Sequence, residues 1–264
     1  MKLDAFTIGE GGKLTVLLHG FLGSGRNLRS VAVRWASRDP SRTFLLPDLR
    51  GHGASPTPPP STTLFDMGDD VLETAGAIGE PPFTLVGHSL GAHVALAATH
   101  QRPELVESVT ILDMTPGPVR VEMSDSAQVM AVMLQAEATT PDRPTMRRFL
   151  QGKGLSTPLT EWVLTNLTQL PDGSYGWRID RAALDALGGN MNREDLWSVV
   201  ERRKIPMRCI RGSRSPYVNA EDLRRFEAAK VPVVTLEAGH FVQVDAFDAL
   251  IAELSREWIS PATT

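Results

Sequence analysis

One pentapeptide, Gly87-His88-Ser89-Leu90-Gly91, restricts the fold of this chain more than any other feature. The apolar run at 83–86 before it predicts a buried strand, and the alanine-rich run at 92–98 after it predicts a helix. A serine on such a sharp turn has a strained backbone and an exposed hydroxyl. The flanking glycines leave room for the turn, because a Cβ there would collide with neighbouring elements. The pattern indicates a nucleophilic serine, although an ordinary glycine-rich turn also fits the pentapeptide alone.

Length and composition are those of an ordinary globular protein. The chain has 264 residues, of which 42% are apolar and 22% charged, and this size fits one large α/β domain or two small ones. Its net charge of −4 provides no basic surface for nucleic acid. No apolar run is long enough to span a membrane, and no apolar signal segment stands at the N-terminus. We therefore expect a cytoplasmic location and a small-molecule substrate as the partner, with the oligomeric state open.

Cys209 is the only cysteine. No disulfide can form within the chain, and a reducing compartment is compatible with this composition. The residue lies in a predicted strand where no positive environment is evident to lower the pKa of the thiol. We interpret it as a buried structural residue and not as a nucleophile.

Short strand-like runs alternate with helix-like runs along the chain. This alternation predicts a mainly parallel sheet that helices cover on both faces. We expect strands at 14–18, 43–46, 83–86, 109–112, 207–210 and 233–236, and helices at 27–37, 65–78, 92–102 and 246–258.

The pattern changes after Asp113. A break at 115–118 precedes a stretch from about 124 to 203 that is helical or irregular, with no convincing strand. We predict that residues 116–204 form a helical cap inserted after the sixth strand, over a core made of residues 1–115 and 205–264. Apolar residues at helical spacing in the cap either face the substrate or pack in its core: Met123, Met130, Met133, Leu134 and Trp162.

His240 is the predicted base for the serine, whose hydroxyl is a weak nucleophile until a base removes its proton. It follows the predicted strand at 233–236, and functional groups in such sheets gather at the carboxyl ends of the strands. Its place in the chain also fits the order serine, acid, histidine of this turn type. A surface loop histidine is the alternative interpretation.

A third group must orient the imidazole and stabilise its charged form. Asp113 ends the strand after the serine helix, and we predict it as this acid. Many enzymes of this type place the acid after the next strand, where this chain has Ser215, which cannot stabilise an imidazolium by charge. We expect Ser215 to support the site by a hydrogen bond. Asp222 and Asp245 are the alternative acids, and a simple turn residue is the alternative for Asp113.

The negative oxygen of an acyl intermediate needs backbone donors, which form an oxyanion hole. We predict the N–H of Leu90, next to the serine, as one donor. The other is expected from Phe21, in the glycine-containing loop at 19–24 that follows the first predicted strand. A plain glycine turn is the alternative for that loop.

Other polar residues near the predicted site are expected to have structural roles. We expect Asp48 and His52 to bond within the loop at 47–55, and Arg50 to brace neighbouring loops. Packing roles are expected for His19, His88 and His93.

Several segments in this order resemble the α/β-hydrolase superfamily: His19-Gly20-Phe21, Asp48–Gly53, Gly87–Gly91 and Gly239-His240-Phe241. Leu112–Pro116 and Arg211–Val218 resemble, more narrowly, the small YbfF-type esterases. That group is described as using an acid at the position of Asp113 and a serine at the position of Ser215. The resemblance implies an α/β-hydrolase sheet with a helical cap, hydrolysis of esters or thioesters, and no metal or organic cofactor.

We therefore predict a serine esterase that hydrolyses carboxylic esters or thioesters of small acyl substrates through an acyl-enzyme intermediate. Ser89, Asp113 and His240 form its catalytic triad in this prediction. A carbon–carbon bond hydrolase or a cofactor-free perhydrolase on the same triad is one alternative. A receptor-like protein that binds a ligand with little turnover is another.

Overall fold

A seven-stranded sheet occupies the centre of the structure, a computed structural model that describes residues 1–119, 125–191 and 193–256. The strand order is β1-β3-β2-β4-β5-β9-β10, and every neighbouring pair is parallel except β1 with β3. The predicted α/β class with a mainly parallel sheet is confirmed. The strands are β1 (Ala5–Ile8), β2 (Lys13–Leu18), β3 (Arg42–Pro47), β4 (Phe83–His88), β5 (Val106–Leu112), β9 (Met207–Gly212) and β10 (Val233–Leu236).

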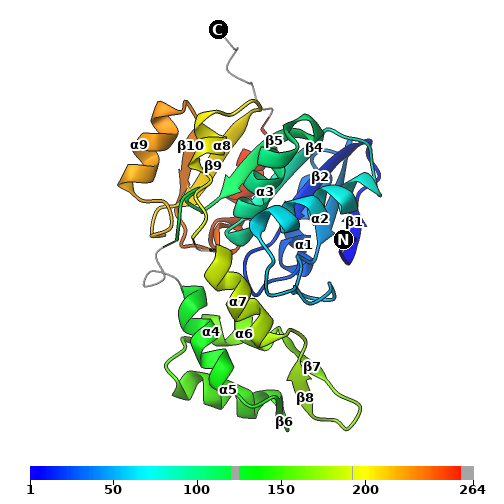
Figure 1. The fold of residues 1–264 in the computed structure, drawn as a ribbon, viewed down its shortest axis with the longest axis vertical. Coiled ribbons are helices and arrows are strands. Elements are labelled where there is room, and N and C mark those ends of the chain that lie inside the picture. Colours follow the sequence, from blue (N-terminus) through cyan, green and yellow to red (C-terminus); the bar gives the residue numbers. More distant parts are fainter. Residues whose placement is uncertain (120–124, 192, 257–264) are drawn as a thin grey trace.

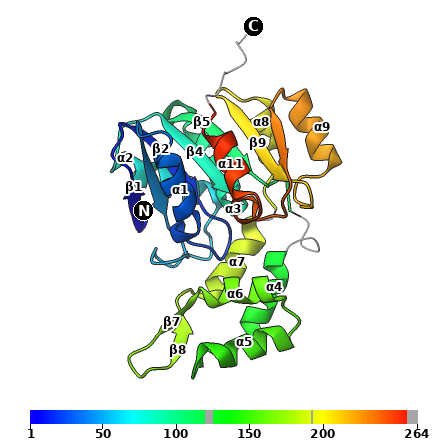
Figure 2. The same cartoon turned by 180° about the vertical axis from the view of Figure 1, so that it is seen from behind.

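Helices cover both faces of the sheet, as the predicted strand pattern requires (Figures 1 and 2). Successive side chains of a strand point to opposite faces. On β2, Val16 and Leu18 pack in the core beneath α2 and α3, whereas Leu17 packs in the core beneath α1 and α11. The helices of this layer are α1 (Arg29–Ala36), α2 (Leu64–Gly76), α3 (Leu90–Gln101), α8 (Trp197–Glu201), α9 (Ala220–Ala228), α10 (Val242–Asp245) and α11 (Phe247–Leu254).

The carboxyl ends of the parallel strands meet at one edge of the sheet. Ser89 follows β4, Asp113 follows β5, and His240 lies in the loop after β10. The loops after β2 and β9 reach the same edge, because β2 pairs with β4 and β9 pairs with β5. Residues far apart in the sequence are thereby brought together.

Most of the segment between β5 and β9 forms a separate layer below the sheet in Figure 1. Four helices and a small antiparallel sheet of order β6-β8-β7 build it. The elements are α4 (Asp125–Gln135), β6 (Thr139–Thr140), α5 (Arg143–Gly152), α6 (Thr157–Leu164), β7 (Leu167–Gln169), β8 (Tyr175–Trp177) and α7 (Arg181–Met191). This arrangement supports a cap, although the division at residues 116–204 stays a prediction. Helix α8 lies within that range yet packs on α3 and α9.

Several sequence predictions need correction. The cap follows β5, the fifth strand of the chain and not the sixth, because a single strand, β1, precedes β2. The edge strand β1 was not predicted, and it is only four residues long. The small sheet in the cap was also missed, because strands of two or three residues are too short to show a period. The helix predicted at 246–258 is observed as α11, which begins at Phe247 and ends at Leu254, and the short helix α10 before it was not predicted. Met123 lies outside the described residues.

Gly91 allows α3 to approach β2 closely, and we expect its substitution to be costly. A Cβ at this position would lie 2.3 Å from the carbonyl oxygen of Leu18, which is backbone and cannot move aside. Gly91→Ala should lower the free energy of unfolding by about 1–3 kcal/mol, as measured by urea denaturation. Gly76→Ala is the matched control at the end of α2, where a Cβ meets nothing within 4 Å. Equal stability of the two variants would contradict the close-approach argument.

Candidate active site

Ser89 occupies a strained turn between β4 and α3. Its backbone has φ 53° and ψ −119°, a conformation that L-residues rarely adopt. The N–H of Ser89 donates to the carbonyl of Leu112 over 3.1 Å, which ties the turn to the end of β5. A Cβ at Gly87 would lie 2.2 Å from the carbonyl oxygen of Gly91, so the glycines of the pentapeptide are required by the packing. The hydroxyl is thus held at the carboxyl edge of the sheet.

Asp113 and His240 are joined by a hydrogen bond of 2.7 Å between Oδ2 and Nδ1. Asp113 is fully buried and has a positive φ of 50°. The N–H of Gly212 donates to its Oδ1 over 2.8 Å, and the hydroxyl of Ser215 donates to its Oδ2. Three donors therefore surround this buried carboxylate, two from the end of β9 and the loop after it and one from the loop after β10, and it would be costly to bury without them.

The alternative acids bond elsewhere. Asp222 accepts from the hydroxyl of Thr115 and from the backbone of Asn219, at the start of α9. Asp245 accepts from the N–H of Gly239 over 2.7 Å. The carboxylate that contacts the ring of His240 is that of Asp113.

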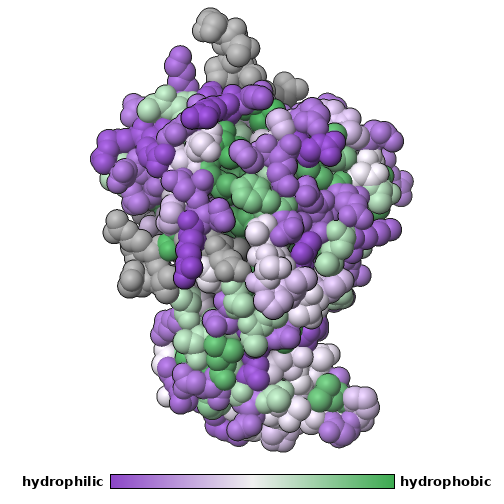
Figure 3. Space-filling model, viewed as in Figure 1, coloured by the Kyte–Doolittle hydropathy of each residue, from purple (hydrophilic) through white to green (hydrophobic). Residues whose placement is uncertain are grey.

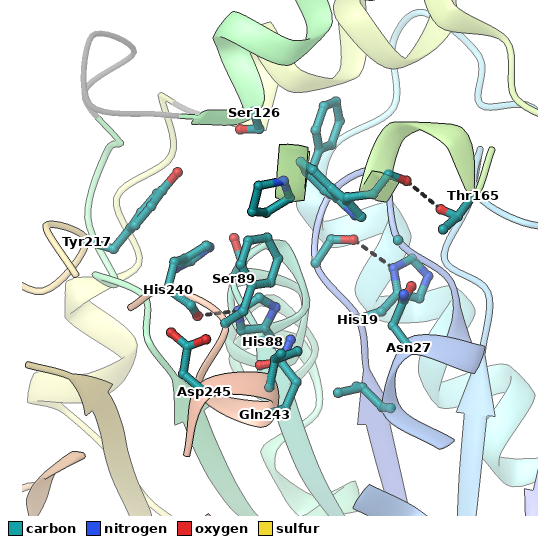
Figure 4. Close-up of a pocket in the computed structure, with 18 of the residues that line it drawn as sticks. His19, Asn27, His88, Ser89, Ser126, Thr165, Tyr217, His240, Gln243 and Asp245 are labelled. Atoms are coloured by element: carbon teal, nitrogen blue, oxygen red, sulfur yellow. Dashed lines mark hydrogen bonds between the residues drawn. The ribbon is translucent and has the colours of Figure 1, made fainter. Parts of the chain in front are cut away.

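The ring of His240 is packed between two aromatic side chains. Tyr217 stacks on it with the ring centroids 3.9 Å apart and the planes 21° apart. His88 lies on it with centroids 4.7 Å apart, and its Nε2–H donates to the backbone carbonyl of His240 over 2.9 Å (Figure 4). Burial lowers the pKa of His88 to about 3, so its ring is a neutral donor. The contact between Tyr217 and His240 was not predicted from the sequence, although Tyr217 lies two residues after Ser215.

Figure 4 shows the Ser89 hydroxyl beside the ring of His240. No hydrogen bond joins these two side chains among the bonds of the described residues. Catalytic bonds of this kind are commonly long in the free enzyme and tighten when substrate binds. The arrangement brings a hydroxyl, an imidazole and a carboxylate together in the order that proton transfer requires.

Three hydrogen bonds fix the loop after β2. His19 donates from Nδ1 to Gly20 over 2.8 Å and accepts at Nε2 from the N–H of Leu49 over 2.9 Å. Burial lowers the pKa of His19 to about 4, which keeps the ring in this neutral form. From the cap, the side-chain amide of Asn166 donates to the carbonyl of Leu22 over 3.0 Å. No local pattern in the sequence predicts this contact of Asn166, because Leu22 lies 144 positions away in the chain.

Two backbone N–H groups at this site have no acceptor among the hydrogen bonds of the described residues. They belong to Phe21, in the loop after β2, and to Leu90, the first residue of α3. Both residues line a cavity that also contains Ser89. The groups are therefore available to an oxygen atom of a bound ligand.

Two cavities meet at Ser89, with volumes of about 420 and 380 Å³. Phe21, Ser89, Ser126 and Tyr217 line both of them. The larger extends past His240 toward Trp162 of the cap, and the smaller extends between α4 and α7. Of the other apolar cap residues singled out in the sequence, the smaller cavity is lined by Met130 and Leu134, whereas Met133 is buried in the core.

The loop at 47–55 has the structural role that the sequence predicts, because its polar side chains bond to nearby backbone and to α2. Asp48 accepts from the N–H groups of Gly25 and Ala54, each over 2.8 Å. Arg50 forms a two-pronged ion pair with Asp70 at 2.6 and 2.8 Å. His52 is buried beside Phe21 and donates to the carbonyl of Arg50.

Cys209 is buried, as expected, and burial raises the pKa of its thiol. Within residues 1–119, 125–191 and 193–256, no cluster of three or more histidine, cysteine, aspartate or glutamate side chains has the arrangement of a metal site. In the same part of the chain, no helix has both the length and the apolar character needed to cross a membrane.

Residues 15–253 match the model of the alpha/beta hydrolase family, so the chain belongs to this family. It is 30% identical to the sn-1-specific diacylglycerol lipase ABHD11 of Xenopus laevis over 241 residues, which are 87% of this chain and 74% of that protein. It is 27% identical to the esterase YbfF of Escherichia coli (strain K12) over 249 residues, 91% of each chain. The solved structure of a marine microorganism esterase shares the fold, with a TM-score of 0.83 at 22% identity over 96% of this chain and 98% of that one. The predicted superfamily is confirmed, and hydrolysis is the class of reaction that this membership supports.

The buried neutral histidines should make the fold sensitive to acid. Burial lowers the pKa of His52 to about 3, whereas an unfolded histidine titrates near about 6.5. Below that pH the unfolded chain binds protons that the folded chain does not, so the free energy of unfolding falls as the pH falls. His52→Phe should reduce this decrease by up to about 1.4 kcal/mol per pH unit, as measured by urea denaturation between about pH 7.5 and 5. Identical slopes in the two proteins would contradict a neutral buried His52.

Proposed function

We propose that the protein is a serine hydrolase of carboxylic esters or thioesters, with Ser89, His240 and Asp113 as its catalytic triad. The observation that carries this proposal is the hydrogen bond of 2.7 Å between the buried Asp113 carboxylate and Nδ1 of His240. This bond leaves Nε2 of His240 as the proton acceptor for the strained Ser89 beside it.

The reaction proceeds in two halves. The Ser89 oxygen attacks the carbonyl carbon of the substrate while its proton passes to Nε2 of His240. The bond to the leaving oxygen or sulfur then breaks, and His240 returns the proton to the leaving alcohol or thiol. In the second half a water molecule gives a proton to His240 and attacks the carbonyl carbon of the acyl group. The bond between that carbon and the Ser89 oxygen then breaks, His240 returns the proton to the Ser89 oxygen, and the acid is released.

The oxyanion of each tetrahedral intermediate is proposed to bind the N–H groups of Phe21 and Leu90. Their lack of a protein acceptor supports this role. The positions of both donors are set before substrate arrives: Leu90 by the start of α3, and the Phe21 loop by the bond from Asn166 to Leu22. Donors fixed in this way stabilise developing charge without reorganisation during the reaction.

Ser215 is proposed to support the acid and not to replace it. Its hydroxyl and the N–H of Gly212 both donate to Asp113, so the loop after β9 solvates a charge supplied by the loop after β5. When His240 becomes positively charged, the adjacent ionised carboxylate stabilises that charge. The acid therefore comes from Asp113 although Ser215 stands in the loop after the next strand.

The substrate class follows from the site and from the relatives. The two cavities at Ser89 offer room on both sides of a scissile bond. The two sequence relatives are a diacylglycerol lipase and an esterase. Esters of uncharged acyl groups are the substrates that we propose, with thioesters open to the same chemistry.

The nucleophile is tested by Ser89→Ala. We expect this variant to lose hydrolysis of short p-nitrophenyl esters, because Ser89 provides the hydroxyl beside the ring of His240. The thermal unfolding temperature of the variant provides the control for folding. Retained turnover in a folded Ser89→Ala protein would overturn the mechanism.

The acid is tested by Asp113→Asn. The amide keeps the shape of the side chain but cannot stabilise an imidazolium, so kcat should fall by about 10⁴-fold. Asp222→Asn is the matched control, because Asp222 is another buried aspartate that bonds away from His240. Steady-state kinetics of both variants decide the assignment, and a loss on Asp245→Asn instead would transfer the role to Asp245.

A further inference from the structure

Helix α7 contains two adjacent glycines, Gly188 and Gly189, within its length. A glycine inside a helix destabilises it by about 1 kcal/mol relative to alanine. Packing does not require these two: a Cβ at Gly189 would meet nothing within 4 Å, and one at Gly188 would meet only the ring of Phe21, at an ordinary 3.5 Å. The fold alone therefore gives no reason for the pair.

The two glycines lie on the wall of the smaller of the two cavities at Ser89, where Gly188 is half-buried and Gly189 is exposed. Gly188 and Gly189 line it from α7, and Met130, Ala131 and Leu134 line it from α4. Its volume of about 380 Å³ lies within the usual range of ligand pockets, about 300–1,000 Å³. Larger side chains on α7 would fill the space between the two helices. The glycine pair thus determines how far this cavity reaches from Ser89.

The position of His240 distinguishes the two cavities. His240 lines the larger cavity and not the smaller one, whereas Leu90 lines the smaller and not the larger. The leaving group must receive its proton from His240, so it occupies the larger cavity. The carbonyl oxygen points to the N–H groups of Phe21 and Leu90, and the acyl chain is left with the smaller cavity.

The lining of the smaller cavity matches an uncharged chain. Apolar side chains form much of its lining, among them Met114, Val119 and Met130, and no lysine or arginine is among the described residues that line it. Asp185 is the charged residue of the lining, and it is exposed at the rim. The outer end reaches the surface at Leu134, which is 44% exposed, and Figure 3 shows apolar residues over α4 on this face. A carboxylate at the far end of the acyl chain would be repelled by Asp185.

We infer that the cavity between α4 and α7 binds an uncharged acyl chain, and that Gly188 and Gly189 set the chain length it accepts. This inference rests on the proposed ester hydrolysis and adds the identity of the acyl subsite. The glycines act as specificity determinants, since they touch the substrate chain but not the reacting atoms.

Gly189→Leu tests the subsite with p-nitrophenyl esters that share one leaving group and differ in acyl length. The added side chain occupies the cavity, so the ratio of kcat/KM for octanoate to that for acetate should fall by at least about tenfold. Ala131→Leu narrows the cavity from the opposite helix, and it should lower the same ratio if the first variant folds poorly. Thermal unfolding of each variant reports on folding.

Gly152→Leu is the matched control. Gly152 ends α5 in the same part of the chain, a Cβ there meets nothing within 4 Å, and the residue lines neither cavity at Ser89. Its substitution should leave the octanoate-to-acetate ratio unchanged. An unchanged ratio in both Gly189→Leu and Ala131→Leu, or a change that instead follows the alcohol in a series of acetate esters, would overturn the inference.

Binding of octanoate to the Ser89→Ala protein separates the inference from the proposed function. Calorimetry should detect weaker binding of octanoate when Gly189→Leu is added to Ser89→Ala, whether or not the native protein hydrolyses the esters. Hydrolysis without this chain-length effect would contradict the inferred acyl subsite but not the proposed function. Binding of octanoate without any ester hydrolysis by the native protein would contradict the proposed function but not the inferred acyl subsite.

Discussion

The close approach of α3 to the sheet is the constraint on which the rest of the site depends. Gly91 lies against the carbonyl of Leu18, and Gly87 lies against the backbone of Gly91, so no side chain fits between the strand and the helix. This contact holds Ser89 in its strained conformation and directs the first N–H of α3 toward the cavity. The strain has a local cost that the buried cores on both faces of the sheet offset. The proposed nucleophile and one proposed oxyanion donor are therefore positioned by the same packing contact.

At the proposed site, one loop provides the charged carboxylate and the next provides the hydrogen bonds to it. Asp113 provides the carboxylate from β5, while Ser215 and Gly212 provide hydrogen bonds from β9. Because β5 and β9 are neighbours, a carboxylate from either strand end lies within reach of the same imidazole. The stacked ring of Tyr217 and the donor His88 restrict His240 further, from the side and through its backbone. The neutral state of His88 matters here, because a second positive ring would oppose protonation of His240.

Local patterns were sufficient where an element is long and regular. The strands and helices around the pentapeptide lie within a few residues of their predicted places, and the six predicted site residues gather at one edge. Prediction failed where the signal is short or distant. Strand β1 and the three-stranded sheet of the cap have too few residues for a period. The bond from Asn166 to Leu22 joins positions that nothing local connects.

The sequence by itself determined the class of the fold, because the class follows from the periodicity of strands and helices. It also indicated the proposed reacting groups, because the pentapeptide at 87–91 has glycines with a steric reason. Only the tertiary structure decided that the predicted Asp113, and not the alternatives Asp222 and Asp245, contacts His240, since this contact joins residues 127 positions apart in the chain. It also decided the shape of the space around Ser89, because that space lies between helices distant in the chain. The sequence alone does not show that Gly189 lines a cavity. This becomes evident only when the opposite wall of the cavity, formed by α4, is known.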